Sequence, residues 1–154
     1  MRARELTAEE AERPLGWRYP EPYATYDAEG PLGRDSGFFA VEDEGGELVG
    51  FGCVGAEARV PGVEEEPGTV DVGYGMRPEL IGQGRGREFV GAVIAHVADA
   101  HPAARLRMSI LGWNARSRHV AVAHGFRVAD RAGEFDVLVR EARRRADGEE
   151  YRHA

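Results

Sequence analysis

The residues best suited to binding a ligand form a glycine-rich turn in the middle of the chain. Three glycines alternate with two polar residues directly before a predicted helix: Gly82, Gln83, Gly84, Arg85 and Gly86. Glycine leaves backbone amides uncovered, and the unpaired N–H groups of a helix's first turn carry partial positive charge. With Arg85 and Arg87 as charged neighbours, the turn predicts a pyrophosphate site. A turn that uses glycine only for its backbone conformation is the alternative.

Two common phosphate-binding motifs do not fit this turn. A P-loop needs a lysine followed by serine or threonine, and the chain contains no lysine. A Rossmann turn needs the spacing G-x-G-x-x-G and an acidic residue about 20 positions later. Here the spacing is G-x-G-x-G, and residues 101–107 contain no acid. Neither class is therefore predicted.

A second segment is marked by residue types that are rare in this chain. The only asparagine, Asn114, opens a predicted short helix that stops at Gly125. Glycine is common where a helix ends through a left-handed residue. Ser117, one of three serines, lies three positions after the asparagine.

Together the two segments resemble a known family. Residues 73–86 resemble the coenzyme-A motif of the GNAT superfamily of acetyltransferases, and residues 114–126 resemble its second signature, an asparagine-led helix closing on Gly-Phe. The similarity spans about residues 36–140. Within the superfamily, the chain resembles a bacterial branch, the ribosomal-protein N-terminal acetyltransferases, in its serine at position 117.

The resemblance implies an α/β (α+β) fold of the GNAT type. Residues 1–154 are expected to form one domain, with residues 141–154 as a C-terminal extension. The expected sheet is mixed, mostly antiparallel and flanked by helices. The strand ending at Met76 and the strand from Leu106 are expected to be a splayed parallel pair that forms the acyl-CoA cleft. Splayed strands expose backbone groups that an extended, amide-bearing ligand can satisfy.

The implied cofactor is acetyl-CoA, used as a co-substrate. Its pantetheine arm is expected along the backbone of Gly75 and Met76, with Asn114 beside it. Its pyrophosphate is expected at five consecutive residues: Gln83, Gly84, Arg85, Gly86 and Arg87. The family usually has arginine or glutamine where this chain has Ile81, so backbone amides and the two arginines must supply the contacts. No metal is expected, because the histidines and the single cysteine share no ligand spacing.

The proton donor for the leaving thiolate is a second departure from the family. Many members have a tyrosine seven residues after the asparagine, and here that position is Ala121. The resemblance assigns this role to Ser117, which could hydrogen-bond the sulfur. A hydroxyl that serves only the first turn of its helix is the alternative.

The proton acceptor must be a group near the cleft, because an amine nucleophile has to lose a proton as it attacks a thioester. Asp71, on the predicted cleft strand, is the first candidate, and similar members also have an acid there. Glu134 and Asp136 on the last hairpin are its rivals. A structural or substrate-orienting role for Asp71 is the alternative.

The acceptor amine is expected to bind an aromatic segment near the N-terminus. Four aromatic residues lie close together there, interrupted by two prolines that break regular structure: Trp17, Tyr19, Tyr23 and Tyr26. Such a segment suggests a lid or pocket wall. Rings that only seal the core under a loop are the alternative.

The function that follows is acetyl-CoA-dependent N-acetyl transfer to a primary amine, by direct attack in a ternary complex. The alternative is a non-catalytic acyl-CoA sensor or interaction module on the same fold. The expected partner is a small-molecule or peptide amine. Whether the chain also forms a homodimer is left open.

The elements that position these residues follow from hydrophobic patterns. Alternation predicts a strand at residues 69–76, with Val70, Val72, Tyr74 and Met76 on one face and Asp71 on the other. A second strand, 105–111, is predicted with one buried face, opposite Arg105 and Arg107. Apolar pairs recurring every four residues predict a helix over 84–100. A helix is expected from Ala8, capped by Thr7. A first strand is expected at residues 2–6, an early hairpin at 37–41 and 47–54, and a last hairpin at 126–131 and 134–140.

Composition limits the remaining possibilities. Twenty basic residues, all arginine, against 27 acidic ones give a net charge of −7, which argues against a nucleic-acid partner. No run approaches the roughly 20 apolar residues that a bilayer needs. The N-terminal residues lack a signal-peptide stretch and Cys53 has no disulfide partner, so a cytoplasmic location is expected, without membrane association.

Overall fold

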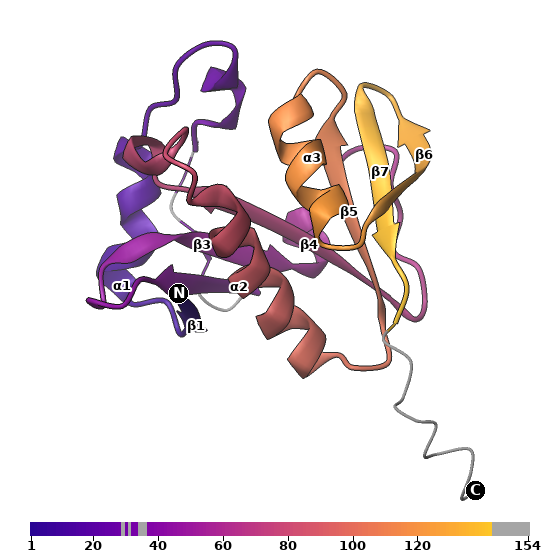
Figure 1. Cartoon of the computed structure of the whole chain (residues 1–154), viewed down its shortest axis with the longest axis horizontal. Helices are drawn as coiled ribbons and strands as arrows, with labels where there is room; N and C mark the ends of the chain where they lie inside the picture. The colour runs from indigo at the N-terminus through magenta and orange to yellow at the C-terminus, as the bar shows by residue number, and fades with distance from the viewer. Residues whose placement is uncertain (29, 31, 34–36, 143–154) are drawn as a thin grey trace, which may run out of the picture.

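A seven-stranded mixed sheet forms the centre of the computed structural model, which describes residues 1–28, 30, 32–33 and 37–142 (Figure 1). The strands are β1 (Arg2–Arg4), β2 (Phe38–Glu42), β3 (Leu48–Val54), β4 (Thr69–Met76), β5 (Arg105–Leu111), β6 (Arg127–Ala132) and β7 (Phe135–Arg140). They lie in the order β1-β2-β3-β4-β5-β7-β6, and only β4 and β5 pair in parallel within this sheet. This arrangement confirms the predicted fold class.

Strands β4 and β5 pair over a short stretch and then part. Residues 69–71 of β4 pair with residues 105–107 of β5. From residue 72 to residue 76, β4 pairs instead with residues 54–50 of β3. Figure 1 shows β4 and β5 diverging beyond their shared stretch. The predicted splay is present, and it leaves one edge of β4 free of any described strand.

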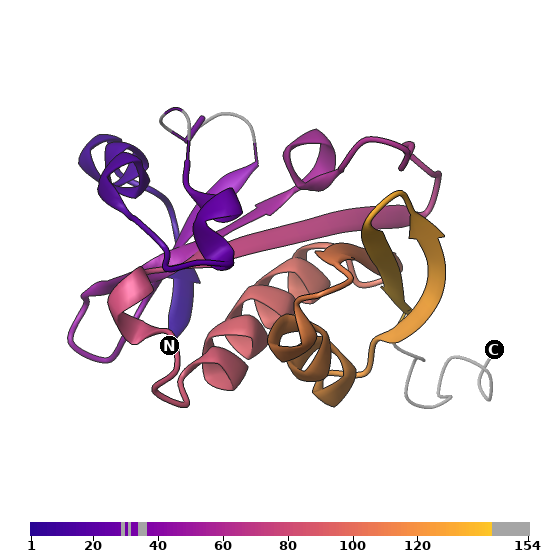
Figure 2. The ribbon, with the colours of Figure 1, turned by 90° about the horizontal axis from the view of Figure 1, so that it is seen from above.

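Helices cover both faces of the sheet. Figure 2 shows α2 (Gly86–Ala100) and α3 (Ala115–Ala123) on one face, with α1 (Ala8–Glu12) and the aromatic segment on the other. Helix α2 links β4 to β5 and buries residues at helical spacing: Phe89, Val90, Val93, Ile94 and Val97. Each such side chain contributes roughly 1.5–3 kcal/mol when fully buried. This confirms the predicted four-residue recurrence.

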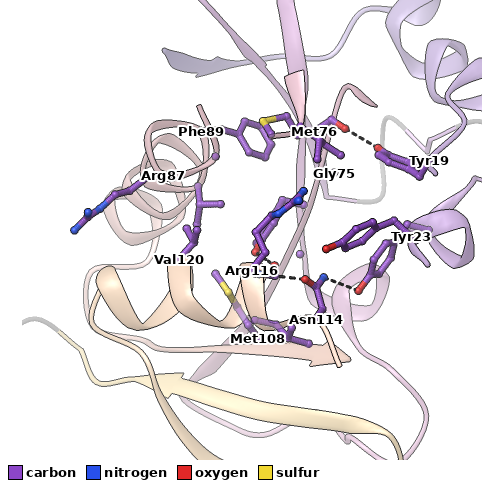
Figure 3. Close-up of a pocket in the computed structure, with 18 of the residues that line it drawn as sticks. Tyr19, Tyr23, Gly75, Met76, Arg87, Phe89, Met108, Asn114, Arg116 and Val120 are labelled. Atoms are coloured by element: carbon purple, nitrogen blue, oxygen red, sulfur yellow. Dashed lines mark hydrogen bonds between the residues drawn. The ribbon is translucent and has the colours of Figure 1, made fainter. Parts of the chain in front are cut away.

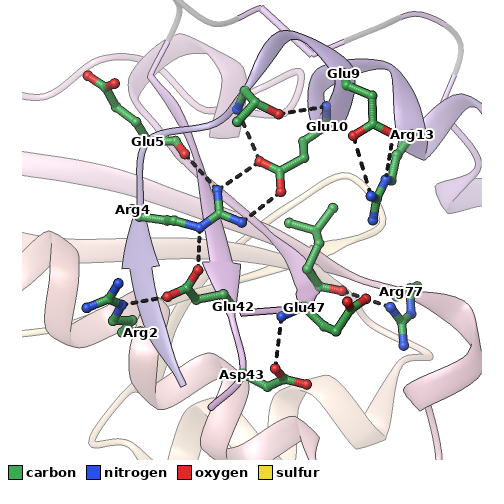
Figure 4. Close-up of polar contacts among 12 residues, drawn as sticks. Arg2, Arg4, Glu5, Glu9, Glu10, Arg13, Glu42, Asp43, Glu47 and Arg77 are labelled. Atoms are coloured by element: carbon green, nitrogen blue, oxygen red, sulfur yellow. Dashed lines mark hydrogen bonds and ion pairs between the residues drawn. The ribbon is translucent and has the colours of Figure 1, made fainter. Parts of the chain in front are cut away.

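Helix α1 is held by its cap and by an ion-pair cluster. The Thr7 hydroxyl accepts a hydrogen bond from the Glu10 amide at 3.1 Å, and the Glu10 carboxylate accepts one from the Thr7 amide at 3.1 Å. Arg4 on β1 donates to Glu10 at 2.7–2.8 Å and also binds Glu42 on β2 (Figure 4). Hydrogen bonds from Arg4 hold the pKa of Glu10 down at about 2. The start of the aromatic segment is thereby fixed against the sheet.

Several elements differ from the sequence prediction. Helix α1 ends after five residues and continues as a 3-10 helix, Arg13–Gly16, with Pro14 in its first turn. Further 3-10 helices, not predicted, span Tyr23–Tyr26, Gly55–Ala58 and Pro78–Leu80. Strand β1 stops at Arg4 rather than residue 6. The expected extension over 141–154 lies, from residue 143, outside the described residues. No helix in residues 1–28, 30, 32–33 and 37–142 could cross a membrane.

Candidate active site

A cavity of about 560 Å³ lies where β4 and β5 part (Figure 3). Residues from six regions line it: Phe51 of β3, residues 72–76 of β4, the middle of β5, the glycine-rich turn with the start of α2, the first turns of α3, and the tyrosines of the aromatic segment. The cavity therefore brings together both sequence motifs and the predicted acceptor segment.

The free edge of β4 presents the backbone of Tyr74 and Met76 to this cavity. The Arg77 amide donates to the Val49 carbonyl of β3 at 2.8 Å, and backbone groups of successive residues point to alternate sides of a strand. The groups of Met76 and Tyr74 therefore point away from β3. Accordingly, the Met76 carbonyl accepts a hydrogen bond from the Tyr19 hydroxyl at 2.6 Å.

Gly75 has a different role from the one expected. Its backbone groups point to β3 by the same alternation, although the residue lines the cavity. A Cβ atom on Gly75 would lie 2.6 Å from the Phe51 ring, so glycine allows β3 and β4 to pack closely. The backbone groups on the free edge of β4 are therefore those of Tyr74 and Met76 and not, as expected, those of Gly75.

Uncovered backbone amides of the glycine-rich turn lie at one end of the cavity. Gly82 and Gly84 have φ angles of +82° and +78°, which side chains disfavour. Helix α2 begins at Gly86 without a side-chain cap, so its first amides are free for a ligand. Gly84, Gly86 and Arg87 line the cavity.

Two residues of the expected pyrophosphate set are not among those that line the cavity. The Gln83 side chain donates to the Glu79 carbonyl at 2.6 Å. The Arg85 guanidinium lies 3.6 Å from the Glu88 carboxylate. Of the charged side chains in this turn, only Arg87 borders the cavity.

Asn114 and Ser117 lie together at the start of α3. The buried Asn114 side chain accepts from the Ser117 amide at 3.2 Å, which caps the helix, and donates to the Tyr26 hydroxyl at 2.9 Å. The Ser117 hydroxyl is 2.6 Å from the Tyr74 hydroxyl. This last hydrogen bond spans the cleft between α3 and β4.

Tyr74 is a site residue that the sequence analysis missed. Its ring packs edge-on against Phe89 at 5.9 Å, and burial raises the pKa of its hydroxyl. The sequence pattern assigned Tyr74 only to a buried strand face. The available signal was a hydroxyl-bearing residue on that face, directly beside the coenzyme-A motif.

Asp71 lies outside the cavity, contrary to expectation. It is 2% exposed, and its carboxylate accepts from Arg107 at 2.6 and 3.1 Å and from Arg59 at 3.0 Å. Hydrogen bonding to Asp71 raises the pKa of Arg107. The alternation along β4 turns this side chain away from the Val72 face, on which α2 packs. Asp71 thus belongs to an ion-pair cluster that joins β4 to β5.

The two rival acids are also absent from the residues that line the cavity. Asp136 lies 3.3 Å from Arg131 and 3.6 Å from Arg118. Glu134 is in the turn between β6 and β7, where its carbonyl accepts from the Gly112 amide at 2.9 Å. No carboxylate among the described residues lines the cavity.

Three of the four expected acceptor-binding aromatic residues line the cavity. Tyr19, Tyr23 and Tyr26 form one wall, whereas Trp17 is buried and stacks on Phe51 at 6.2 Å. For Trp17 the sealing role that the sequence left open is therefore the observed one.

Two residues near Asn114 that were not predicted contact these tyrosines, and one of them, Arg116, lines the cavity. Trp113 packs against Tyr23 at 5.4 Å and Tyr26 at 6.1 Å. The Arg116 guanidinium lies 5.2 Å from the centre of the Tyr23 ring. Their position beside the only asparagine was the available signal. Elsewhere in the described ranges, no group of three acidic, histidine or cysteine side chains could hold a metal.

Comparisons with known proteins agree with this architecture. The fold is similar to a structure of AAC(6')-Ib in complex with ribostamycin and coenzyme A, with a TM-score of 0.57 and 18% identity over 71% of this chain and 68% of that one. It is also similar to the N-acetyltransferase PseH of Campylobacter jejuni in complex with acetyl coenzyme A, with a TM-score of 0.54 and 14% identity over 68% of this chain. The chain spans 66% of PseH, just under two thirds of its length.

The sequence comparisons give a narrower result. No curated protein matches the chain. Residues 3–127 match the acetyltransferase (GNAT) domain family. With its two motifs, its splayed parallel strands and a family match over most of its length, the chain belongs to the GNAT acetyltransferase family.

Proposed function

We propose that this protein is an acetyl-CoA-dependent N-acetyltransferase that transfers the acetyl group directly to a primary amine. The observation that carries the proposal is one cavity that joins free helix amides, a free strand edge and a hydroxyl pair.

The cofactor fits this cavity by the chemistry of its walls. The amides of Gly84, Gly86 and Arg87, with the Arg87 guanidinium, are suited to a pyrophosphate. The Tyr74 backbone and the Met76 amide can pair with the amides of the pantetheine arm, as a strand neighbour would. The Met76 carbonyl already accepts a hydrogen bond from the Tyr19 hydroxyl, so the pantetheine arm is not expected to bind it.

The proposed proton donor to the leaving sulfur is the hydroxyl pair of Ser117 and Tyr74, which lie 2.6 Å apart. When the C–S bond of the thioester breaks, the sulfur takes a proton from the hydroxyl pair, and the pair regains one, through solvent, from the proton that the amine nitrogen loses. Burial raises the pKa of Tyr74, which keeps its hydroxyl protonated at neutral pH. A thiol titrates near pH 8.5, below a tyrosine, so the transfer to sulfur is completed only when the hydroxyl pair takes up the proton released by the amine.

Direct attack is supported by the position of the single cysteine. Cys53 lies in β3, is 4% exposed and is not among the residues that line the cavity. Burial raises the pKa of its thiol to about 12, so it is a poor nucleophile at neutral pH. The ternary complex expected from the sequence remains the proposed route, in the expected cytoplasmic location.

The test separates an enzyme from a non-catalytic acyl-CoA sensor. Calorimetry measures acetyl-CoA binding, and a thiol assay with mass detection measures transfer to a panel of amines. An enzyme binds acetyl-CoA and releases free thiol only when an accepted amine is present. Tight binding with no acetylated product from any amine class would establish the sensor instead.

A further inference from the structure

The charges around the cavity are of one sign. Among the described residues that line it, only Arg87 and Arg116 are charged. Elsewhere arginines are commonly paired with carboxylates, as Arg107 is with Asp71 and Arg4 with Glu10. Within the described ranges, neither cavity arginine has an ion pair or a side-chain hydrogen bond.

The two arginines lie at different parts of the site. Arg87 is on α2 beside the glycine-rich turn, where the proposed function uses it for the pyrophosphate. Arg116 is in the first turn of α3, 5.2 Å from the Tyr23 ring centre. Figure 3 shows Arg116 near the centre of the view, whereas Arg87 lies on α2 and is directed away from it. The pantetheine arm expected between them carries no charge, so it offers the Arg116 guanidinium no anionic partner.

A free guanidinium in a cavity wall selects for anions. Its planar fork of N–H donors matches the two oxygens of a carboxylate or phosphate. The ring below it holds the guanidinium by a cation–π contact while its donor edge stays open. A polycationic amine would instead place its charges near Arg116, with no carboxylate from the described lining residues to bind them.

We propose, resting on the proposed function, that the acceptor is a primary amine that also carries a carboxylate or phosphate group bound by Arg116. The apolar part of such an acceptor packs on Tyr23 and Tyr26. Its amine is then directed from this wall toward the Tyr74–Ser117 hydroxyl pair. The acceptor class therefore differs from the aminoglycosides bound by the similar AAC(6')-Ib structure.

The test measures binding by calorimetry, with the protein alone and saturated with CoA. Two probe pairs differ mainly in the anionic group: phenylalanine with 2-phenylethylamine, and O-phosphoethanolamine with ethanolamine. The anionic member of at least one pair is expected to bind about tenfold more tightly than its partner. The pair that shows the difference distinguishes a carboxylate from a phosphate.

Two variants assign the difference to one residue. Arg116→Gln is expected to abolish it, and its melting curve serves as the folding control because the side chain is on the surface. Arg127→Gln on β6, which removes an exposed arginine paired with Glu141 at 3.0 Å, is expected to leave it unchanged.

Three results would overturn the inference: equal binding within both pairs, tighter binding of spermidine than of either anionic probe, or a difference that survives in Arg116→Gln. Because the readout is binding, it is independent of turnover. Anionic amines that bind but are never acetylated would refute the proposed function alone.

Discussion

Replacing Asp71 by asparagine should destabilise the protein far more than it slows the reaction. The carboxylate is buried at the last residue pair that joins β4 to β5, with Arg107 at 2.6 Å and Arg59 at 3.0 Å. Removing one charge from a buried ion pair costs about 3–5 kcal/mol. Glu66, 3.1 Å from Arg107, remains as a partner, so the low end, about 3 kcal/mol, is expected. For a domain of this size that lowers Tm by roughly 6–12 °C.

The assay compares unfolding with kinetics at a temperature well below both transitions. There, kcat/KM of Asp71→Asn should stay within about threefold of the wild-type value at every pH, because the residue does not border the cavity. Glu66→Gln is the matched control, since its half-exposed carboxylate binds the same arginine and should cost less than about 1 kcal/mol. A variant with unchanged Tm, but a rate loss of tenfold or more that shrinks as pH rises, would restore Asp71 as the base.

Three further variants test other parts of the structure. Tyr74→Phe should lower kcat by about 10- to 100-fold and leave acetyl-CoA affinity unchanged. The double variant Tyr74→Phe with Ser117→Ala should be no slower than the slower of the two single variants. Additive losses would mean that the two hydroxyls act separately. Gly84→Asp should weaken acetyl-CoA binding by about 100-fold or more in calorimetry. Gly68→Asp is the control, because Gly68 has the same φ of +78° and the same open space, and it should leave binding unchanged. Equal losses in both variants would assign the effect to backbone strain. Glu10→Gln should cost at most about 3 kcal/mol at pH 7 in urea unfolding. Because the folded pKa of Glu10 is lowered from 4.5 to about 2, its contribution is present above pH 4.5 and lost as pH falls toward 2, and a pH-independent cost would contradict the ion pair with Arg4.

The parts of the fold that could be predicted are those with a local signal. The spacing of Phe89, Val93 and Val97 alone predicts which face of α2 is buried. The side chain of Asn114 caps α3 because the residue directly precedes it, as the sequence order indicates. The glycine-rich turn has a left-handed backbone conformation at Gly82 and Gly84, where the sequence has glycine. In each case the cause lies within one or two helical turns of its effect.

The roles of the acidic residues could not be predicted, because they depend on distant partners. Alternation correctly places Asp71 on the opposite strand face from Val72, but it does not say which face borders the cleft. Arg107, 36 residues later, belongs to a row on β5 that the sequence pattern assigns away from the core. Only the register of the short parallel pairing brings the two together. An acid and an arginine at matching positions of adjacent strands are also the pattern of a structural ion pair.

The hydroxyl pair was missed for a related reason. A row of apolar side chains on a strand normally indicates a core, and the row of Val72, Tyr74 and Met76 does pack on α2. Where the sheet splays, however, the same row becomes a cavity wall. The strand's buried face therefore contributes both to stability and to the site, and its one hydroxyl is directed toward Ser117.

The position of the acids also bears on how the acceptor loses its proton. With Asp71 engaged in joining the strands and no described carboxylate in the cavity, the amine's own pKa sets how much reactive form is present at neutral pH. An α-amine titrates near 7.7–8.0, so about one molecule in ten is neutral at pH 7, against about one in 2,500 for a lysine-like amine near 10.4. A cavity with arginine rather than carboxylate in its wall therefore favours amines that titrate low and carry their anionic group at a distance, as a short peptide does with its α-amino group and its C-terminal carboxylate. Arg116 favours an acceptor with an anionic group, and the lack of a carboxylate among the described lining residues favours an amine of low pKa. A short peptide has both properties.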